Sequence, residues 1–378
     1  MATINELRIR PSLFLSLLVI FVTVMSAARA DDPKDIKELK LRDWQPRSMM
    51  VTKTTIIEKP LFPVIDVHNH LGGGAKDLTS KRVMHYVEEL TAAGVKTVVD
   101  LDGGWGTRLK ERVKALDEAY PGRFLTFALI NFEGIDDENW SGREVKQLEE
   151  SFHAGAKGLK FHKTLGLIYR HKDGRPMQVD DTKLDPIWEL CAKHHRPVMI
   201  HTGDPAAFFT PLDQFNERWH ELNANPNWLF YGPQYQSREK LFEQLNHVIA
   251  KHPKTTFICA HFGNNAEDLA SVGKWLDAYP NMYIDIDARI SELGRQPYTA
   301  RRFIIKYQDR VMFGTDTTPD REAYRIYYRF LETDDEYFDC AKSHHLQGFW
   351  RIYGIYLPNE VLAKVYYQNA EKILYGLK

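Results

Sequence analysis

The feature that most constrains the fold is a regular alternation of short apolar runs with helix-like segments after residue 63. Apolar runs rich in β-branched and aromatic residues begin near Val64, Val95, Phe124, Gly158, Pro197, Thr256, Met282 and Val311. Helix-like segments lie between most of them, at 80–93, 108–120, 141–154, 185–194, 238–251 and 266–279. Strands that alternate with helices predict a parallel sheet, and eight such strands are the number that closes a (β/α)8 barrel. We therefore predict an α/β protein with a single TIM-barrel domain.

The first thirty residues have the composition of a secretory signal peptide. Arg8 and Arg10 precede an apolar stretch from Leu13 to Met25, and Ala28-Arg29-Ala30 supplies small residues for cleavage. The apolar stretch is short of the ~20 residues that a membrane span needs. We expect cleavage before Asp31, export to the periplasm or the medium, and no stable membrane insertion of the mature chain. An uncleaved anchor is the alternative.

The mature chain is expected to consist of a polar lead-in at 31–62, with a short strand at 51–57, and a barrel domain at 63–378. Helix-like segments at 324–331 and 359–374 follow the eighth strand, the latter closing the domain. The interval between the fifth and sixth strands is unusually long and rich in aromatic residues, namely Phe208, Phe209, Phe215, Trp219, Trp228, Tyr231 and Tyr235. This insertion is either a lid or substrate-binding element, or a packing or subunit contact.

Charge and cysteine content exclude two classes of protein. Lys+Arg 50 and Asp+Glu 51 nearly cancel and no basic block occurs, so we expect no nucleic-acid partner. Cys191, Cys259 and Cys340 are odd in number and widely spaced, so we expect small buried residues rather than a disulfide framework. The insertion and the tyrosine-rich stretch 324–328 would suit a homodimer contact.

Histidine and aspartate residues recur at the ends of the predicted strands. They are His68 and His70 after the first, His201 after the fifth, His261 after the sixth and Asp316 after the eighth. Alternation places His68 and His70 on one face, and the strand ends of a barrel meet at its C-terminal face. We therefore predict that these side chains converge on one metal site.

Histidine nitrogens with one carboxylate suit Zn²⁺, with Fe, Co, Mn or Ni as alternatives. Such an ion lowers the pKa of bound water and polarises a carbonyl. Asp316 is placed to bridge metal and water and to carry a proton to a leaving group. His261 would orient the water or stabilise developing negative charge.

The chain resembles the amidohydrolase superfamily, and within it the branch that contains aminocarboxymuconate-semialdehyde decarboxylase, resorcylate decarboxylases and lactone hydrolases. The motifs that carry the resemblance are 66–70 (Asp-Val-His-Asn-His), 200–203 (Ile-His-Thr-Gly), 260–263 (Ala-His-Phe-Gly), 313–316 (Phe-Gly-Thr-Asp) and 365–370 (Val-Tyr-Tyr-Gln-Asn-Ala). The similarity extends over roughly 63–377. It implies a single divalent ion held by His68, His70, His201 and Asp316, with His261 and Asp316 as catalytic residues.

Three further residues are candidate substrate contacts. Lys160, in the fourth strand, stands where two-metal members of the superfamily carry a carboxylated lysine, so a second ion is expected only if Lys160 is carboxylated. Otherwise Lys160 would bind a substrate carboxylate or form an ion pair. His162 shares its face and is a possible substrate contact, although a loop residue without that role is the favoured interpretation. Arg289 could clamp a carboxylate, whereas Asp102 is expected to be structural.

Three functions are compatible with this pattern. The leading hypothesis is an exported metal-dependent hydrolase that uses metal-activated water on an amide, ester or lactone of a small molecule. The first alternative is a metal-dependent nonoxidative decarboxylase, a carboxy-lyase, that acts on a small unsaturated or aromatic carboxylic acid. The second alternative is a non-catalytic binding protein on a barrel scaffold.

Overall fold

The computed structural model describes residues 36–40, 43–44, 47–72, 78–341 and 350–376, so the expected signal peptide lies outside the described residues. The chain divides into two units, residues 1–48 and 49–378, and the second unit contains all eight strands. Within the described part of the chain, no helix is both long enough and apolar enough to cross a membrane.

The eight strands begin within one residue of the predicted positions, and every neighbouring pair in the two sheets is parallel. One sheet has the order β1-β2-β3 and the other β4-β5-β6-β7-β8. The strands are β1 (Val64–Asn69), β2 (Val95–Asp100), β3 (Phe124–Thr126), β4 (Leu159–Phe161), β5 (Val198–Ile200), β6 (Phe257–Cys259), β7 (Met282–Asp285) and β8 (Val311–Met312).

Backbone hydrogen bonds connect the two sheets at both of their edges. Between β3 and β4, the N–H of Lys160 donates to the carbonyl of Ala128 at 2.9 Å. Between β8 and β1, the N–H of Asp316 donates to the carbonyl of His68 at 2.8 Å, and isolated parallel bridges occur at both edges. The predicted TIM barrel is confirmed.

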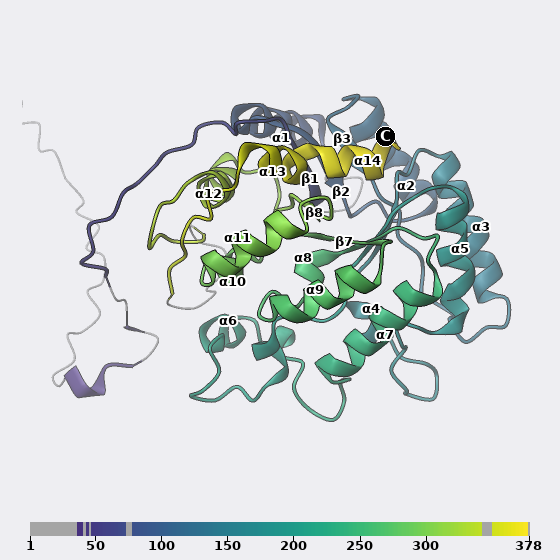
Figure 1. The fold of residues 1–378 in the computed structure, drawn as a ribbon. Coiled ribbons are helices and arrows are strands. Elements are labelled where there is room, and N and C mark those ends of the chain that lie inside the picture. Colours follow the sequence, from purple (N-terminus) through teal and green to yellow (C-terminus); the bar gives the residue numbers. More distant parts are fainter. Residues whose placement is uncertain (1–35, 41–42, 45–46, 73–77, 342–349, 377–378) are drawn as a thin grey trace, which may run out of the picture. The chain divides into compact units, whose positions relative to one another are not determined.

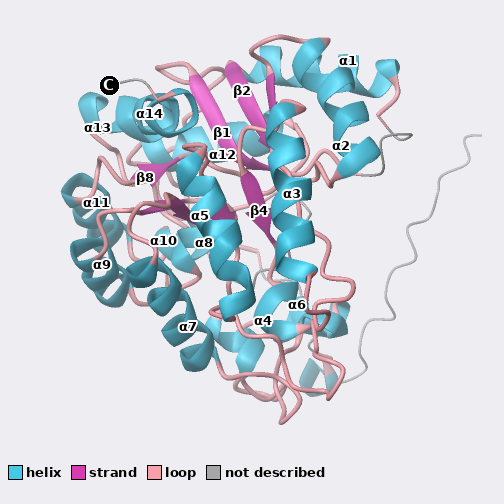
Figure 2. Cartoon of the chain, turned by 90° about the vertical axis from the view of Figure 1, so that its right-hand side faces the viewer, coloured by secondary structure: helices cyan, strands magenta, loops and turns pink. Residues whose placement is uncertain are grey.

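Helices surround the strands, as Figures 1 and 2 show. Those that follow the strands of the barrel include α1 (Ser80–Ala93), α2 (Gly106–Val113), α3 (Trp140–His153), α5 (Asp185–Lys193), α7 (Arg238–Lys251), α9 (Leu269–Ala278), α11 (Pro297–Lys306), α12 (Arg321–Glu332), α13 (Asn359–Ala363) and α14 (Asn369–Tyr375). The shorter helices are α4 (Thr164–Leu167), α6 (Trp219–Ala224), α8 (Ala260–Gly263) and α10 (Ile290–Leu293). The predicted 108–120 and 359–374 segments each contain a π-helical turn, Lys114–Glu118 and Lys364–Gln368.

Local sequence explains where helices begin and end. The side chain of Thr79 accepts a hydrogen bond from the N–H of Arg82, and Gly94 ends α1 with a φ of 76°. Ser237 caps α7 in the same way. Helix α11 is absent from the sequence prediction, and it begins with Pro297 at its first turn, where a missing N–H costs nothing.

Alternate strand residues belong to two different apolar clusters. Val198, Phe257 and Val311 belong to the large cluster that the strands share with the helices. Met199, Ile258, Tyr283 and Met312 belong to a smaller cluster, on the opposite face of each strand. Because Met199 and Tyr283 are two residues before His201 and Asp285, this smaller cluster lies directly beneath the polar ends of the strands. It forms the apolar floor of the candidate site.

Two sequence predictions outside the barrel strands are wrong. Residues 51–57 form no strand, because the N–H and hydroxyl of Thr55 bond to the Asp335 carboxylate instead of to a partner strand. The stretch 324–328 does not offer an exposed dimer contact, because Tyr324, Tyr327 and Tyr328 are buried within the chain. The hydroxyl of Tyr328 donates to the carbonyl of Ala93. A homodimer stays a prediction.

A buried ion pair connects the insertion between β5 and α7 to the segment that follows β7. The buried Arg218 guanidinium pairs with the carboxylate of Glu221 within the insertion and with that of Glu292 in α10. Breaking such a buried pair leaves an uncompensated charge, so the contact holds this end of the insertion firmly. Phe208 is buried, whereas Phe215 is 84% exposed, so only part of the aromatic content serves packing.

Two of the three cysteines, Cys191 and Cys259, are buried as predicted, whereas Cys340 is partly exposed.

Candidate metal centre

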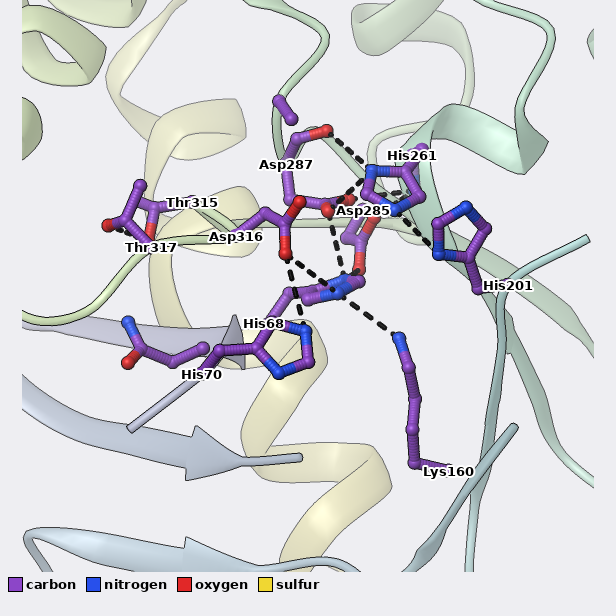
Figure 3. A network of polar contacts seen from close by, with 12 residues as sticks. His68, His70, Lys160, His201, His261, Asp285, Asp287, Thr315, Asp316 and Thr317 are labelled. Atoms are coloured by element: carbon purple, nitrogen blue, oxygen red, sulfur yellow. Dashed lines mark hydrogen bonds and ion pairs between the residues drawn. The ribbon is translucent and has the colours of Figure 1, made fainter. Parts of the chain in front are cut away.

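The predicted site residues come together at the C-terminal ends of the strands. Figure 3 shows His68, His70, Lys160, His201, His261 and Asp316 around one centre. His68 lies within β1, Lys160 within β4, and His201 directly after β5, while His261 belongs to the short turn α8 after β6. The convergence predicted from strand ends is therefore present in the fold.

One nitrogen of each ring faces this centre. The Oδ1 atom of Asp316 lies 3.5 Å from Nε2 of His68 and 3.3 Å from Nε2 of His70. The Nε2 atom of His261 lies 3.1 Å from Nδ1 of His201. Lys160 Nζ lies 3.1 Å from Nε2 of His68. These atoms come from five strands or the turns that follow them.

The other nitrogen of each ring has an oxygen partner behind it. Nδ1 of His70 lies 2.7 Å from Oδ1 of Asp102, and Nε2 of His201 lies 3.0 Å from the carbonyl of Gly203. Nδ1 of His68 lies 3.1 Å from Asp285 and 3.0 Å from Asp287. Oxygen partners of this kind fix the orientation of a ligating imidazole.

Asp285 and Asp287 were not identified from the sequence. Both are fully buried at the end of an apolar strand, and they are two residues apart on one face. Two acidic residues at the end of an apolar strand are the sequence pattern from which these residues could have been identified. Asp102, which was expected to be structural, contacts the ring of His70 and the N–H of Gly72, so it supports the centre from outside.

The backbone at the centre has unusual conformations. His261 and Asp316 have φ values of 58° and 60°, in the left-handed region that non-glycine residues rarely adopt. At residue 314, a Cβ would lie 3.0 Å from Cβ of His68 and 3.1 Å from Cβ of Asp287, closer than most such contacts, so glycine relieves crowding there. Such strained conformations persist where the surroundings determine them, and they often occur at active sites.

Burial dominates the electrostatics of the centre. It lowers the pKa of His68 to about 4, and it places the pKa of His201 well below the usual value, with the neighbouring His261 ring lowering it further. These two rings are therefore neutral near pH 7 and carry a free nitrogen lone pair. Burial also lowers the pKa of Lys160. For Asp316, burial acts to raise the pKa, but the nearby His68 and His261 outweigh it and the pKa falls.

The donor set fits a divalent metal ion. His68, His261, Asp287 and Asp316 each offer a ligand atom within 4.8 Å of the others. This group shares His68 and Asp316 with the predicted ligands. His70 contacts it through Asp316, and His201 contacts it through His261. Nitrogen and carboxylate donors of this kind are those that Zn²⁺ and related ions prefer.

A cavity of about 280 Å³ adjoins the centre on the side of β2 to β4. Lys160 and His162 line it, together with the aromatic residues Trp105, Phe132, Phe161 and Tyr169. The His162 ring stacks on that of His70 with centroids 5.8 Å apart, and burial lowers the pKa of His162 to about 3. The cavity therefore connects two predicted substrate contacts with the candidate metal centre.

Arg289 occupies a different place from the other predicted substrate contacts. Its Nη2 donates to the side-chain oxygen of Asn264 at 2.9 Å, and Nη1 donates to the carbonyl of Ala288. Asn264 ends the turn that carries His261, and its carbonyl accepts from Arg238 at 2.7 Å. In this structure, Arg289 supports that turn.

The fold and the centre define a TIM-barrel protein with a histidine- and aspartate-rich site at the ends of its strands. The family model described as amidohydrolase matches residues 65–376, and the chain belongs to this family. Members of this family are metal-dependent enzymes, and this chain is an enzyme of that family.

Solved structures support the fold. A TIM-barrel protein from Bordetella bronchiseptica is 16% identical, with a TM-score of 0.53, over 83% of this chain and 99% of that chain. The 2,6-dihydroxybenzoate decarboxylase from Rhizobium is 16% identical, with a TM-score of 0.52, over 83% of this chain and 98% of that chain. No curated protein sequence matches the chain.

Replacing His201 tests the predicted ligand set. His201→Ala removes one ring nitrogen that faces the centre, so the variant should lose most of its bound metal while it remains folded. The measurement is metal per chain by elemental analysis, with circular dichroism for the fold. His85→Ala, on an exposed position of α1, is the control and should keep its metal. Unchanged metal content in His201→Ala would remove His201 from the ligand set.

Proposed function

We propose that the protein is an exported metal-dependent hydrolase that cleaves an amide, ester or lactone of a small molecule. The observation that carries the proposal is the position of Asp316. Its Oδ1 atom is within 3.5 Å of Nε2 of both His68 and His70, beside a cavity large enough for a small substrate. Four ligands, His68, His70, His201 and Asp316, would hold one divalent ion, with Zn²⁺ as the proposed metal.

When bound, such an ion lowers the pKa of water and polarises a substrate carbonyl. Asp316 accepts a proton from the water and passes it to the leaving nitrogen or oxygen. The water oxygen forms the new bond to the carbonyl carbon as the bond to the leaving group breaks. His261 donates a hydrogen bond to the developing negative charge.

Lys160 and His162 would orient the substrate from the cavity. Lys160 Nζ lies between the cavity and the ring of His68, so it can donate to an oxygen of the substrate beside the metal. If Lys160 were instead carboxylated, it would hold a second ion. Arg289 supports the turn of His261, and we do not assign it a contact with the substrate.

A second candidate is nonoxidative decarboxylation of an aromatic or unsaturated carboxylic acid. The cavity favours it, because Trp105, Phe132 and Tyr169 offer flat apolar surfaces and Lys160 offers a cation for a carboxylate. The 2,6-dihydroxybenzoate decarboxylase with the similar fold acts on an aromatic acid.

Oxygen-18 labelling separates the two reactions. The metal-loaded protein is incubated in labelled water with panels of small amides, esters and lactones, and with hydroxybenzoic acids. Hydrolysis places one labelled oxygen in the carboxylic acid product, whereas decarboxylation releases CO₂ and forms a C–H bond. Label in an acid product supports the proposal. CO₂ release without it contradicts the proposal in favour of the second candidate, and metal binding without turnover of either panel contradicts both.

Replacing Asp316 tests its role as the proton carrier. Asp316→Asn keeps the size of the side chain but cannot accept the proton of water, so kcat/KM should fall by about 10²- to 10⁴-fold or more. Asp277→Asn, at an exposed surface acid, is the matched control and should retain activity. Metal content is measured in both variants, so that a lost ion is distinguished from a lost base. Full activity in Asp316→Asn would contradict this role.

The proposal of export depends on Arg8, Arg10 and the apolar stretch at 13–25. The full-length gene product should be cleaved before Asp31 in cells, which N-terminal sequencing of the purified protein measures. A purified protein that still begins at the first residues of the chain would contradict export with cleavage.

A further inference from the structure

A glycine-rich turn after β2 presents Trp105 to the cavity beside the metal centre. The glycines on either side of Trp105 have φ values of 75° and 57°, in the left-handed region that glycine adopts without strain. At Gly103 a Cβ would lie 2.0 Å from the carbonyl oxygen of Phe127, so only glycine fits there. The carbonyl of Gly104 accepts a hydrogen bond from the N–H of Leu129 at 2.8 Å, which ties the turn to the segment that forms the cavity wall.

The indole of Trp105 is free to contact a ligand. The residue is 38% exposed, and its indole makes no ring contact, cation contact or hydrogen bond within the described part of the chain. Phe132, which lines the same cavity, is packed instead. Its ring stacks on that of Tyr169 with centroids 4.4 Å apart, and it also contacts the rings of Trp140 and Phe161. The cavity therefore has one fixed aromatic wall and one unpartnered ring.

Glu133 carries the only carboxylate among the described residues that line this cavity. Its backbone is fixed, because its N–H donates to Oδ1 of Asn131 at 3.0 Å and its carbonyl accepts from Arg143 at 2.8 Å. The charge of Arg143 is directed elsewhere, to Glu144 at 3.3 Å and to Asp137 at 3.9 Å. The exposed carboxylate of Glu133 has no hydrogen bond or ion pair with any residue that the structure describes.

The groups that line the cavity lie at different depths. Lys160 is buried, with Nζ 3.1 Å from Nε2 of His68, whereas Trp105 and Glu133 are exposed. At about 280 Å³ the cavity is near the lower limit of small-molecule sites, roughly 300–1,000 Å³, so it suits a single ring. The face of an indole attracts cations more strongly than other aromatic side chains do, and a carboxylate binds a planar guanidinium through two hydrogen bonds. The outer end of the cavity therefore favours a flat cation.

We propose that Trp105 and Glu133 form a subsite for a planar, positively charged nitrogen group of the substrate, such as an amidinium, a guanidinium or a protonated heteroaromatic ring. The carbonyl that is cleaved then lies at the metal centre, at the end of the cavity where Lys160 is buried. Trp105 and Glu133 are specificity-determining residues in this account. The inference rests on the proposed function, since it names the substrate class of the same site, but its test needs no turnover.

Benzamidinium and benzamide are matched probes of this subsite, because they share a ring and a planar end group and differ by one charge. Their dissociation constants are measured by isothermal titration calorimetry on the wild-type protein, with chromatography to show that benzamide is not consumed. Benzamidinium should bind about 3- to 10-fold more tightly than benzamide. Because the carboxylate of Glu133 is exposed, added salt should reduce this preference.

Two variants separate the charge from the ring. Glu133→Gln keeps the shape of the side chain but removes its charge, so benzamidinium should bind about 3- to 10-fold more weakly while the affinity for benzamide is unchanged. Glu138→Gln, at an exposed acid that does not line the cavity, is the matched control and should behave as the wild type. Trp105→Ala should weaken both probes by about threefold or more, because each loses the ring on which it stacks. The Glu133 result stands even if Trp105→Ala does not fold.

A wild-type protein that does not bind benzamidinium, or that binds both probes equally, would overturn the proposal. A preference for benzamidinium that persists in Glu133→Gln would overturn it too. A protein that shows the Glu133-dependent preference but forms no labelled acid would refute the proposed hydrolysis and leave the subsite intact. Labelled acid from neutral substrates, without any preference for benzamidinium, would refute the subsite alone, so the two failures are distinguishable.

Discussion

The site depends on the oxygen atoms that lie behind its histidine rings. Carboxylates contact the outward nitrogens of His68, His70 and His261, and a backbone carbonyl contacts that of His201. A metal ion needs lone pairs that point to one place, and an imidazole can turn over or change tautomer unless its other nitrogen is fixed. The geometry of the centre therefore depends as much on the ends of β2 and β7, which supply Asp102, Asp285 and Asp287, as on the strands that bear histidine.

The barrel combines an apolar floor with a polar upper layer, and this combination stabilises the contacts between the polar groups of the site. Met199, Ile258, Tyr283 and Met312 exclude water from below, which strengthens every charge interaction above them. Close packing around the site also requires a residue without a side chain and unusual backbone conformations. Gly314 lets β8 pass against His68 and Asp287, and the left-handed conformations of His261 and Asp316 aim their side chains inward. Residues far from the chemistry, such as Arg238 and Arg289, hold one of these turns through Asn264.

Much of this was predictable from the sequence, because strand alternation and strand ends are local patterns. All eight strands, and the meeting of His68, His70, His201, His261 and Asp316, follow from such patterns. The roles of Asp285 and Asp287 were not predictable in the same way. Their partners are the ring of His68, over 200 residues away in the sequence, and the turn after β6. Only the three-dimensional fold brings these groups together.

The errors have the same origin. The apolar residues of 51–57 suggested a strand, yet strand formation needs a neighbouring strand, and Thr55 finds the Asp335 carboxylate instead. The tyrosines at 324–328 suggested a surface contact, whereas α12 packs them against β8 and the C-terminal helical segment, with Phe313 beside Tyr324 and Tyr366. The composition of a segment indicates that its side chains pack against other groups, but it does not indicate which groups these are.

Metal content tests the central claim most directly. The mature wild-type protein is purified without added metal and without chelator, and divalent ions per chain are counted by elemental analysis. We predict about one ion per chain, which the donors His68, His70, His201 and Asp316 would hold. About two ions would indicate a carboxylated Lys160 and a binuclear centre. No ion, with none bound after Zn²⁺ is supplied, would contradict the account and favour a barrel that binds its ligand without metal chemistry.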